Sequence, residues 1–241
     1  MQDEIVVIWF KRDLRWEDHP PLLKAIDLLK EGFCQKIFCF AVIEPSLVKD
    51  PHYSRRHWRF VRESIQNMNA DSKSYIHLFE EEIPLIFDKL RSRYNVKMVL
   101  SHAETGIGIS YDRDKIMASY FNHMGIPWEE FQQNGVIRGL KNRKNWREQW
   151  FHFMNEQIAE LEVKTDFFVR LNAKSSVKLN LKNYASSAIA SDNNFQPGGA
   201  SHGWNYLKSF VEGRIQHYME SISKPLESAL YCSRLSPYIA W

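Results

Sequence analysis

The sequence predicts an α/β protein with a Rossmann-like, doubly wound sheet of five parallel strands, followed by a linker and the first helices of an all-α domain. Three observations support this prediction. Short apolar runs of strand length alternate with segments of helical periodicity over the first part of the chain. The chain has 241 residues, of which 44% are apolar, so it can bury a large core. A segment rich in Ser, Asn, Ala and Gly then separates these runs from a further helical segment.

Five apolar runs are expected to form the strands. IVVIWF (5–10) and KIFCFAVI (36–43) are rich in β-branched and aromatic residues, which is typical of strands buried on both faces. VKMVL (96–100) repeats the pattern, and SYIHLF (74–79) and IPWEEF (126–131) do so more weakly. Because helical segments lie between the runs, the connections are crossovers and we expect a parallel sheet.

The intervening helices are predicted from the spacing of their apolar residues. PPLLKAIDLLKEG (20–32) and IPLIFDKLRSRY (83–94) each place such residues on one face. These are Leu22, Leu23, Ile26 and Leu29 in the first segment, and Ile83, Ile86, Leu90 and Tyr94 in the second. The alternation of strands and helices fills residues 1–135, which we predict to be one α/β domain.

Two further helices are predicted beyond this domain. In NWREQWFHFMNEQIAEL (145–161) apolar residues recur at helical spacing, and the tryptophans are expected to lie in a core. The periodicity is lost over residues 171–201, so residues 136–200 are predicted to be a helix and an interdomain connector. GWNYLKSFVEGRIQHYMESI (203–222) places one apolar stripe along a single long helix, and residues 201–241 are predicted to begin a helical domain.

Charge and cysteine content narrow the class of protein. The 32 basic residues face 29 acidic ones, and a net charge of +3 does not by itself indicate a nucleic-acid binder. Cys34, Cys39 and Cys232 form no C-x-x-C pair, so neither a zinc site nor a disulfide framework is indicated and a reducing cytoplasm fits best. The acidic N-terminus is unlike a signal peptide and no apolar run has membrane-spanning length, so we expect a cytoplasmic protein with no membrane partner.

Two turns lie at predicted carboxyl ends of strands, where doubly wound sheets bind ligands. KRDLRWEDHP (11–20) is densely charged and is either a solvated loop or part of a site. In SHAETGIGISYDRD (101–114), Gly106 and Gly108 let a ligand approach the backbone, and Ser110 can cap the next helix. This turn lacks both G-x-G-x-x-G and the P-loop lysine, so dinucleotide or triphosphate binding does not follow.

The other motifs in the sequence indicate less about function. RGLKNRKNWR (138–147) is basic, and it either contacts phosphates or is a solvated surface loop. The nine histidines show no metal-binding spacing, and no G-x-S-x-G nucleophile elbow occurs. Neither a metal ligand nor a catalytic nucleophile is predicted.

Several segments, taken in order, resemble the DNA photolyase and cryptochrome family. They are VVIWFKRDLRWEDHPPL, SRRHWRFVRESI, ETGIGISYDRD, GVIRGLKNRKNWREQW, QPGGASHGWNYLKSFVEGRIQHYM and CSRLSPYIAW. The resemblance extends over nearly the whole chain apart from the connector, and it lies in the shared order of the motifs more than in any one of them.

The resemblance implies an α/β antenna domain joined to an all-helical domain that holds FAD. CSRLSPYIAW (232–241) resembles the flavin phosphate loop near the start of that helical domain, so we expect the antenna domain, the linker and the first piece of the flavin domain of a longer protein. A helix opening at Ser236 would point free N–H groups at a pyrophosphate. The residues that match the family's flavin site are Tyr218, Ser233, Leu235 and Ser236, together with Cys232, which stands where threonine is usual.

The resemblance also points to residues for an antenna chromophore, which is a folate, a deazaflavin or a flavin in different members. Glu104 matches an acidic residue that contacts the chromophore in folate-using members, and Arg12 and Arg55 lie in segments that flank the antenna pocket in others. His19 replaces the usual asparagine of the first turn.

The implied function is that of the light-harvesting part of a deoxyribodipyrimidine photolyase, a flavin-dependent lyase whose partner is UV-damaged DNA. The chain is not expected to repair DNA alone. Two alternatives stay open: a cryptochrome photoreceptor with the same cofactors, and a free-standing nucleotide-binding α/β module. An exposed apolar stripe on residues 203–222 would favour self-association.

Overall fold

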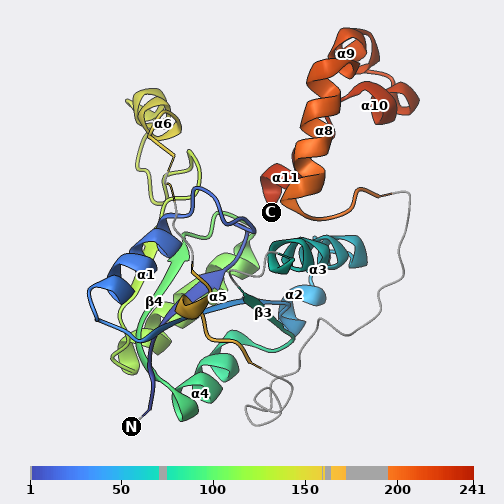
Figure 1. The fold of residues 1–241 in the computed structure, drawn as a ribbon. Helices are drawn as coiled ribbons and strands as arrows, with labels where there is room; N and C mark the ends of the chain where they lie inside the picture. The colour runs from blue at the N-terminus through green and yellow to red at the C-terminus, as the bar shows by residue number, and fades with distance from the viewer. Residues whose placement is uncertain (1, 71–74, 159, 161–163, 172–194) are drawn as a thin grey trace.

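The computed structural model describes residues 2–70, 75–158, 160, 164–171 and 195–241 (Figure 1). Its centre is a five-stranded parallel sheet of order β3-β2-β1-β4-β5, which confirms the predicted fold class. The strands are β1 (Glu4–Phe10), β2 (Lys36–Val42), β3 (Ile76–Phe79), β4 (Asn95–His102) and β5 (Trp128–Phe131). The chain builds outward from β1 to β3 and then returns to the other side of β1, so the strand order reverses between β1 and β4. In such sheets ligands bind beyond the carboxyl ends of the strands at this reversal.

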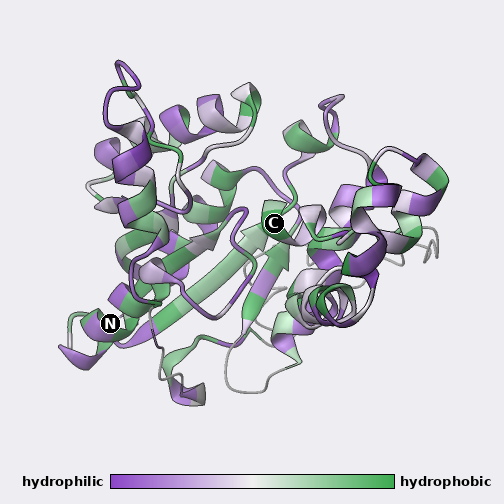
Figure 2. Ribbon diagram, turned by 90° about the horizontal axis from the view of Figure 1, so that it is seen from above, coloured by the Kyte–Doolittle hydropathy of each residue, from purple (hydrophilic) through white to green (hydrophobic). Residues whose placement is uncertain are grey.

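Helices cover both faces of the sheet because successive side chains of β1 point to opposite sides. Val6, Ile8 and Phe10 pack into one apolar core, and Ile5, Val7 and Trp9 pack into the other. The first core is completed by α1 (Pro20–Lys30) and α3 (Arg55–Asn69), and the second by α4 (Ile83–Arg93) and α5 (Gly108–His123). A short helix, α2 (Pro45–Val48), follows β2. Figure 2 shows the strands mostly green between helices of mixed hydropathy.

Part of the connector is tied to the sheet. After η1 (Thr165–Phe167), Phe168 pairs with Ile37, and the Val169 amide donates to the Ile37 carbonyl at 2.9 Å. The strand β3 begins opposite Cys39, two residues further along β2, so this segment covers the start of β2 that β3 leaves open. Residues 172–194 of the connector lie outside the described residues.

The helix predicted over residues 145–161 is shorter than expected. Helix α6 (Trp146–Met154) ends at Met154, and none of its residues is buried. The prediction that its tryptophans lie in a core is wrong, since Trp146 and Trp150 are 36% and 37% exposed. The physical reason is its position: α6 projects from the body of the sheet domain (Figure 1).

The single long helix predicted over residues 203–222 is also wrong. Helix α8 (Ala200–Glu212) stops at Gly213, and η3 (Arg214–His217) and α9 (Tyr218–Ser221) follow in a new direction. Gly213 has φ −156° and ψ −55°, which is not helical. Arg214 stabilises the break, because its guanidinium donates to the carbonyls of Tyr206 and Cys232. The chain then continues through α10 (Pro225–Tyr231) and α11 (Ser236–Ala240).

The start of α8 packs tightly on α3. The amide of Gly198 donates to Oε2 of Glu63 at 2.8 Å, and a methyl group added at Gly198 would lie 2.1 Å from the Phe60 carbonyl oxygen. The backbone approaches α3 closely only because residue 198 has no side chain. Among the described residues, no helix is long and apolar enough to cross a membrane.

Candidate ligand site at the carboxyl edge of the sheet

The turn after β1 is held by a buried carboxylate. Asp13 is fully buried, and its Oδ1 accepts the Lys11 amide at 2.7 Å. Its Oδ2 lies 2.9 Å from Nε2 of His19 and 2.6 Å from Nδ1 of His102. Burial disfavours the ionised form of this carboxyl group. Hydrogen bonds from His102 and His19 outweigh the effect of burial and hold the pKa of Asp13 far below its usual value. The turn is therefore fixed in a single shape by residues of β4 and α1.

His19, which stands where the resemblance implies an asparagine, has a structural role in this turn. It caps α1, because its Nδ1 accepts the Leu22 amide at 3.1 Å. Because Nδ1 accepts a hydrogen bond, it carries no proton. The ring proton is therefore on Nε2, which donates a hydrogen bond to Asp13. Asp13, His19 and His102 are the one group of this kind within the described ranges whose ligand atoms are close enough for a metal, all within 4.8 Å. Because Nε2 of His19 presents a proton instead of a lone pair, the geometry favours a hydrogen-bonded role for this group.

A network of buried ion pairs lies beside this turn. The ammonium of Lys11 is 2.6 Å from Oδ2 of Asp114. Arg113 contacts three carboxylates: Glu44 at 2.7 Å, Asp114 at 2.9 Å and Glu104 at 3.0 Å. The network joins the ends of β2 and β4 to the first turns of α5.

The environment of this network changes the protonation of its members. Burial raises the pKa of Glu44 to about 7, against the attraction of Arg113. Burial lowers the pKa of Lys11, although Asp114 opposes this. For Arg113 burial also disfavours the charge, but Glu44, Asp114 and Glu104 outweigh it and raise the pKa above its ordinary value. The edge of the sheet is thus preorganised by charges that are largely shielded from water.

Gly106 brings two of the predicted antenna residues together. A methyl group added there would lie 2.5 Å from Nη1 of Arg12 and 2.6 Å from Oε1 of Glu104. The same carboxylate oxygen of Glu104 accepts the Gly106 amide at 2.6 Å. The sequence predicted that a ligand could approach the backbone at this glycine, and in the structure the side chains of Arg12 and Glu104 lie there. The hydroxyl of Ser110 does not cap α5 from outside, because Ser110 lies inside the first turn and donates to the Ile107 carbonyl.

A cavity of about 520 Å³ opens next to Arg12, between the start of α3 and helix α11. Its lining holds three arginines, two histidines and several aromatic rings, and no acidic residue. The guanidinium of Arg12 lies 5.0 Å from the ring centre of Trp241, and that of Arg56 lies 5.3 Å from the ring centre of Phe195. The charged and aromatic residues of the lining include Arg12, Tyr53, Arg56, His57, Arg59 and Trp241.

The positive charge of the cavity lining affects the pKa of His57. Burial, followed by the positive charges of Arg56 and Arg12, lowers the pKa of this histidine. A cavity that disfavours an additional positive charge is suited to an anion. Its aromatic walls suit a planar ring system.

The predicted antenna residues are placed unequally by the structure. Arg12 lines the cavity and Glu104 lies behind Gly106, whereas Arg55 is exposed at the first position of α3 and is not among the lining residues. The sequence reasoning missed Arg56 and Arg59, which lie three residues apart on one face of α3. The signal was present in SRRHWRF, because residues at that spacing share a helix face.

The predicted flavin residues lie in the C-terminal segment. Ser236 lines the cavity, but its hydroxyl does not cap α11, whose N-cap is Leu235. Tyr218 packs edge-on against Phe210, with ring centres 5.8 Å apart. Ser233 and Cys232 are half-buried, and the Cys232 carbonyl accepts from Arg214.

A second cavity, of about 510 Å³, lies on the other side of Arg12 and Trp241. It is bounded by α3, α8 and α11, and its lining includes Leu235 and the largely exposed Trp204. Neither of the two cavities includes Tyr218 or Ser233. The described structure therefore brings Arg12, Leu235 and Ser236 to the two adjoining cavities, with Glu104 close to Arg12. It leaves Tyr218, Cys232 and Ser233 outside them.

Comparison with known proteins defines the class. The family model for DNA photolyase matches residues 6–144, which is more than half of the chain. The chain therefore belongs to the DNA photolyase family, as the order of its motifs indicated.

Solved structures show the same fold. A cryptochrome from Synechocystis sp. is 17% identical with a TM-score of 0.68, the match covering 100% of this chain and 53% of the other. A class III photolyase from Agrobacterium tumefaciens is 16% identical with a TM-score of 0.68, covering 99% and 50%. An archaeal photolyase from Sulfolobus tokodaii, with two FAD molecules, is 17% identical with a TM-score of 0.64, covering 98% and 51%. The chain spans about half the length of these structures. Among curated proteins, none matches it.

Proposed function

We propose that this chain supplies the light-harvesting part of a flavin-dependent DNA photolyase. Residues 1–135 would form the antenna domain, residues 136–200 the connector, and residues 201–241 the first helices of the flavin domain. The observation that carries the proposal is the cavity at the carboxyl edge of the sheet, which combines arginines and aromatic rings in a chain of this family. A bound antenna chromophore would absorb near-ultraviolet or blue light and pass the excitation to FAD, whose reduced form repairs pyrimidine dimers in DNA.

The lining residues fit such a chromophore. Trp241 and Tyr53 offer ring faces for stacking, and Arg12 and Arg56 offer charges for a phosphate or carboxylate group. The Glu104 carboxylate, held by Arg113 and the Gly106 amide, would attract the Arg12 guanidinium, which also lies close to Gly106. The archaeal photolyase solved with two FAD molecules is described as implying a novel light-harvesting cofactor, which supports a flavin as one candidate beside folate and deazaflavin.

The FAD site itself is proposed on Tyr218, Cys232, Ser233, Leu235 and Ser236. Ser233 and Ser236 would offer hydroxyl groups to the flavin phosphates, and Tyr218 would line the flavin. Burial raises the pKa of Tyr238 to about 12, so this neighbouring phenol stays neutral and donates to the Pro197 carbonyl at 2.8 Å, which holds α11 in place. These roles rest on the family pattern.

Titration of the purified chain with a folate, a deazaflavin and flavins tests the antenna proposal. We expect one of them to bind with a shift of its near-ultraviolet or blue absorption band. Arg56→Gln, which removes a lining charge, should weaken binding by about tenfold, as expected for one charge-assisted contact. Arg55→Gln is the matched comparison, because its side chain is adjacent but does not line the cavity. If adenine nucleotides bind and no chromophore does, the chain is a nucleotide-binding module instead.

A cryptochrome is the second candidate, because the Synechocystis cryptochrome and the Agrobacterium photolyase match with the same TM-score of 0.68. The decisive assay is blue-light repair of pyrimidine dimers by the full-length product of the gene. Repair supports a photolyase. A flavin-loaded protein that leaves dimers intact supports a cryptochrome.

Self-association is proposed for the helices after the connector. Their exposed apolar residues include Trp204 at 67%, Met219 at 79% and Leu226 at 89% exposure. Apolar groups exposed in this number favour association. Size-exclusion chromatography of the chain should show a species larger than a monomer, and a monomer at all concentrations would contradict it.

A further inference from the structure

A strongly basic surface segment spans the connection from β5 to α6 and the first two residues of α6. Five of the 32 basic residues of the chain, and none of its 29 acidic residues, lie in residues 132–147. The local charge therefore exceeds the net charge of +3 of the whole chain. We call residues 138–147 the basic arm; its charged side chains are Arg138, Lys141, Arg143, Lys144 and Arg147.

The charges of the basic arm are largely uncompensated. Every residue from 138 to 150 is exposed. Arg138 pairs with Glu130 at 2.7 Å. The other four cations form no ion pair with any described residue. An ordinary solvated surface mixes both signs of charge, so a run of this kind creates a local positive potential.

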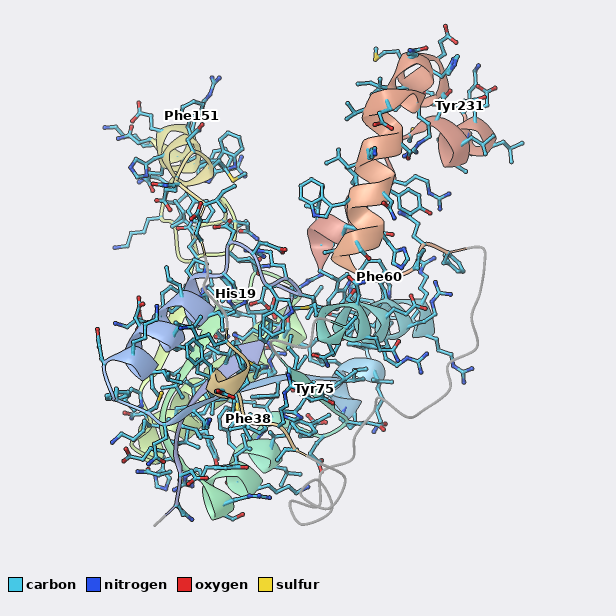
Figure 3. The ribbon with its side chains drawn as sticks, viewed as in Figure 1. His19, Phe38, Phe60, Tyr75, Phe151 and Tyr231 are labelled. Atoms are coloured by element: carbon cyan, nitrogen blue, oxygen red, sulfur yellow. The ribbon has the colours of Figure 1, made fainter. Side chains whose placement is uncertain are left out.

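Two tryptophans fix the end of the basic arm to Gly135, near the start of the segment that follows β5. Nε1 of Trp146 donates to the Gly135 carbonyl at 3.2 Å. A methyl group added at Gly135 would lie 1.9 Å from Trp150, so this ring rests directly on the glycine. The two tryptophan rings also pack on each other, with centres 6.3 Å apart. The cations are thus presented by an anchored loop, and Figure 3 shows Phe151 at the outer end of this projection, on α6.

We propose that the basic arm binds the sugar-phosphate backbone of nucleic acid. The chemistry of recognition is the release of counterions when lysine and arginine neutralise phosphates, and it requires no base sequence. Lys141, Arg143, Lys144 and Arg147 supply the phosphate contacts. Phe151, which is 63% exposed beside them, offers a ring on which an unpaired base can stack. This surface is separate from the cavity at the carboxyl edge, none of whose lining residues belongs to the arm.

The test measures fluorescence anisotropy of undamaged oligonucleotides, single-stranded and duplex, in the dark between about 50 and 200 mM KCl, where the salt dependence is steep. The triple variant Lys141→Gln/Arg143→Gln/Lys144→Gln should bind both forms at least about tenfold more weakly and lower the slope of log K against log salt by about 2–3. The control is Lys30→Gln/Lys49→Gln/Lys115→Gln, which loses the same charge from exposed lysines elsewhere. It should stay within about twofold of the unmodified chain, since it retains every arm contact.

The two forms of nucleic acid separate the possible sources of the phosphates. The more tightly bound form identifies the ligand, and a weakening by Phe151→Ala restricted to the single strand identifies base stacking. The proposal is overturned if the arm variant and the control bind equally, or if the unmodified chain shows no salt-dependent binding. It is also overturned if phosphatidylserine vesicles bind through the arm and oligonucleotides do not. The assay needs neither light nor chromophore, so it can fail independently of the photolyase proposal.

Discussion

Arg12 and Leu14, in the turn after β1, both contact Trp241. The guanidinium of Arg12 lies 5.0 Å from the centre of its ring, and the Leu14 amide donates to its carbonyl at 2.7 Å. Arg12 and Trp241 both line the two cavities that flank them. The position of the C-terminal helix α11 and the shape of the candidate site are therefore coupled through these two residues.

The first prediction concerns this contact. Trp241→Ala removes one wall of the cavity and the ring that Arg12 covers, a loss on the order of 1 kcal/mol or more for a stacked ligand. We expect about a tenfold rise in the Kd of the chromophore, measured by the absorption titration. Ile239→Ala is the control, because Ile239 is 80% exposed and lines the other cavity. Equal affinities for the two variants would show that Trp241 does not contact the ligand.

The second prediction uses the raised pKa of Glu44. Its ordinary pKa of 4.5 rises to about 7 in the folded protein, so the folded state binds the proton more tightly than the unfolded state. The stability due to this group is fully present below pH 4.5 and is lost as the pH rises through 7. Glu44→Gln keeps an acceptor for Arg113 but cannot ionise. As the pH rises from 5 to 9, the unfolding free energy of the original chain should fall relative to that of Glu44→Gln, by up to about 3 kcal/mol.

Urea unfolding at a series of pH values measures this difference. Glu129→Gln serves as the control, because it removes a carboxylate of an edge strand that takes no part in the network around Arg113. A difference between Glu44→Gln and the original chain that does not change with pH would mean that Glu44 stays ionised in the folded protein.

Most of the fold follows from patterns in the sequence, and the failures have common causes. The continuous apolar run IVVIWF predicted a strand buried on both faces, and its residues do divide between two cores. Periodicity could not predict where α6 and α8 end. In α8 the break depends on Gly213 and on Arg214, which reaches carbonyls of residues distant along the chain. Apolar spacing was also read as burial for α6, although its neighbours leave it exposed.

The candidate site was predicted in part. Arg12 and Glu104 were named from the family resemblance, and both lie close to Gly106, while their role in binding a chromophore stays a prediction. Arg56 was missed because which face of α3 meets the cavity depends on α11, almost 180 residues later in the chain. The hydrogen bond between Asp13 and His19 was missed, although the turn was interpreted as either a solvated loop or part of a site, because a buried carboxylate in a charged run has no signature in the sequence alone.

The third prediction concerns His77, which is buried and stacked on Phe38. Its Nε2 donates to the Val169 carbonyl at 3.0 Å, and burial lowers its pKa from 6.5 to about 4. The unfolded state therefore binds more protons between these values. Stability is retained above pH 6.5 and falls by about 3 kcal/mol as the pH drops towards 4.

Hydrogen exchange of the Val169 amide, which bonds to Ile37, reports the detachment of this segment. Exchange there should accelerate between pH 6.5 and 4 beyond the intrinsic change, and His77→Gln should remove most of that acceleration because it cannot titrate. The Val99 amide, which bonds to Pro127 between β4 and β5, is the internal reference. Parallel behaviour of the two amides would rule out a local effect of His77.

The fourth prediction concerns the contact between α8 and α3. Gly198→Ala would place a methyl group 2.1 Å from the Phe60 carbonyl oxygen, a backbone atom that cannot move aside. The chain must then lift from α3, and the hydrogen bond from the Gly198 amide to Glu63 is lost. Overpacking of this kind costs about 1–3 kcal/mol. Hydrogen exchange in the first turn of α8 should accelerate by about tenfold or more. Gly108→Ala is the matched control, because nothing lies within 4 Å of its added methyl group. Unchanged exchange in Gly198→Ala would mean that α8 is not held against α3 in solution.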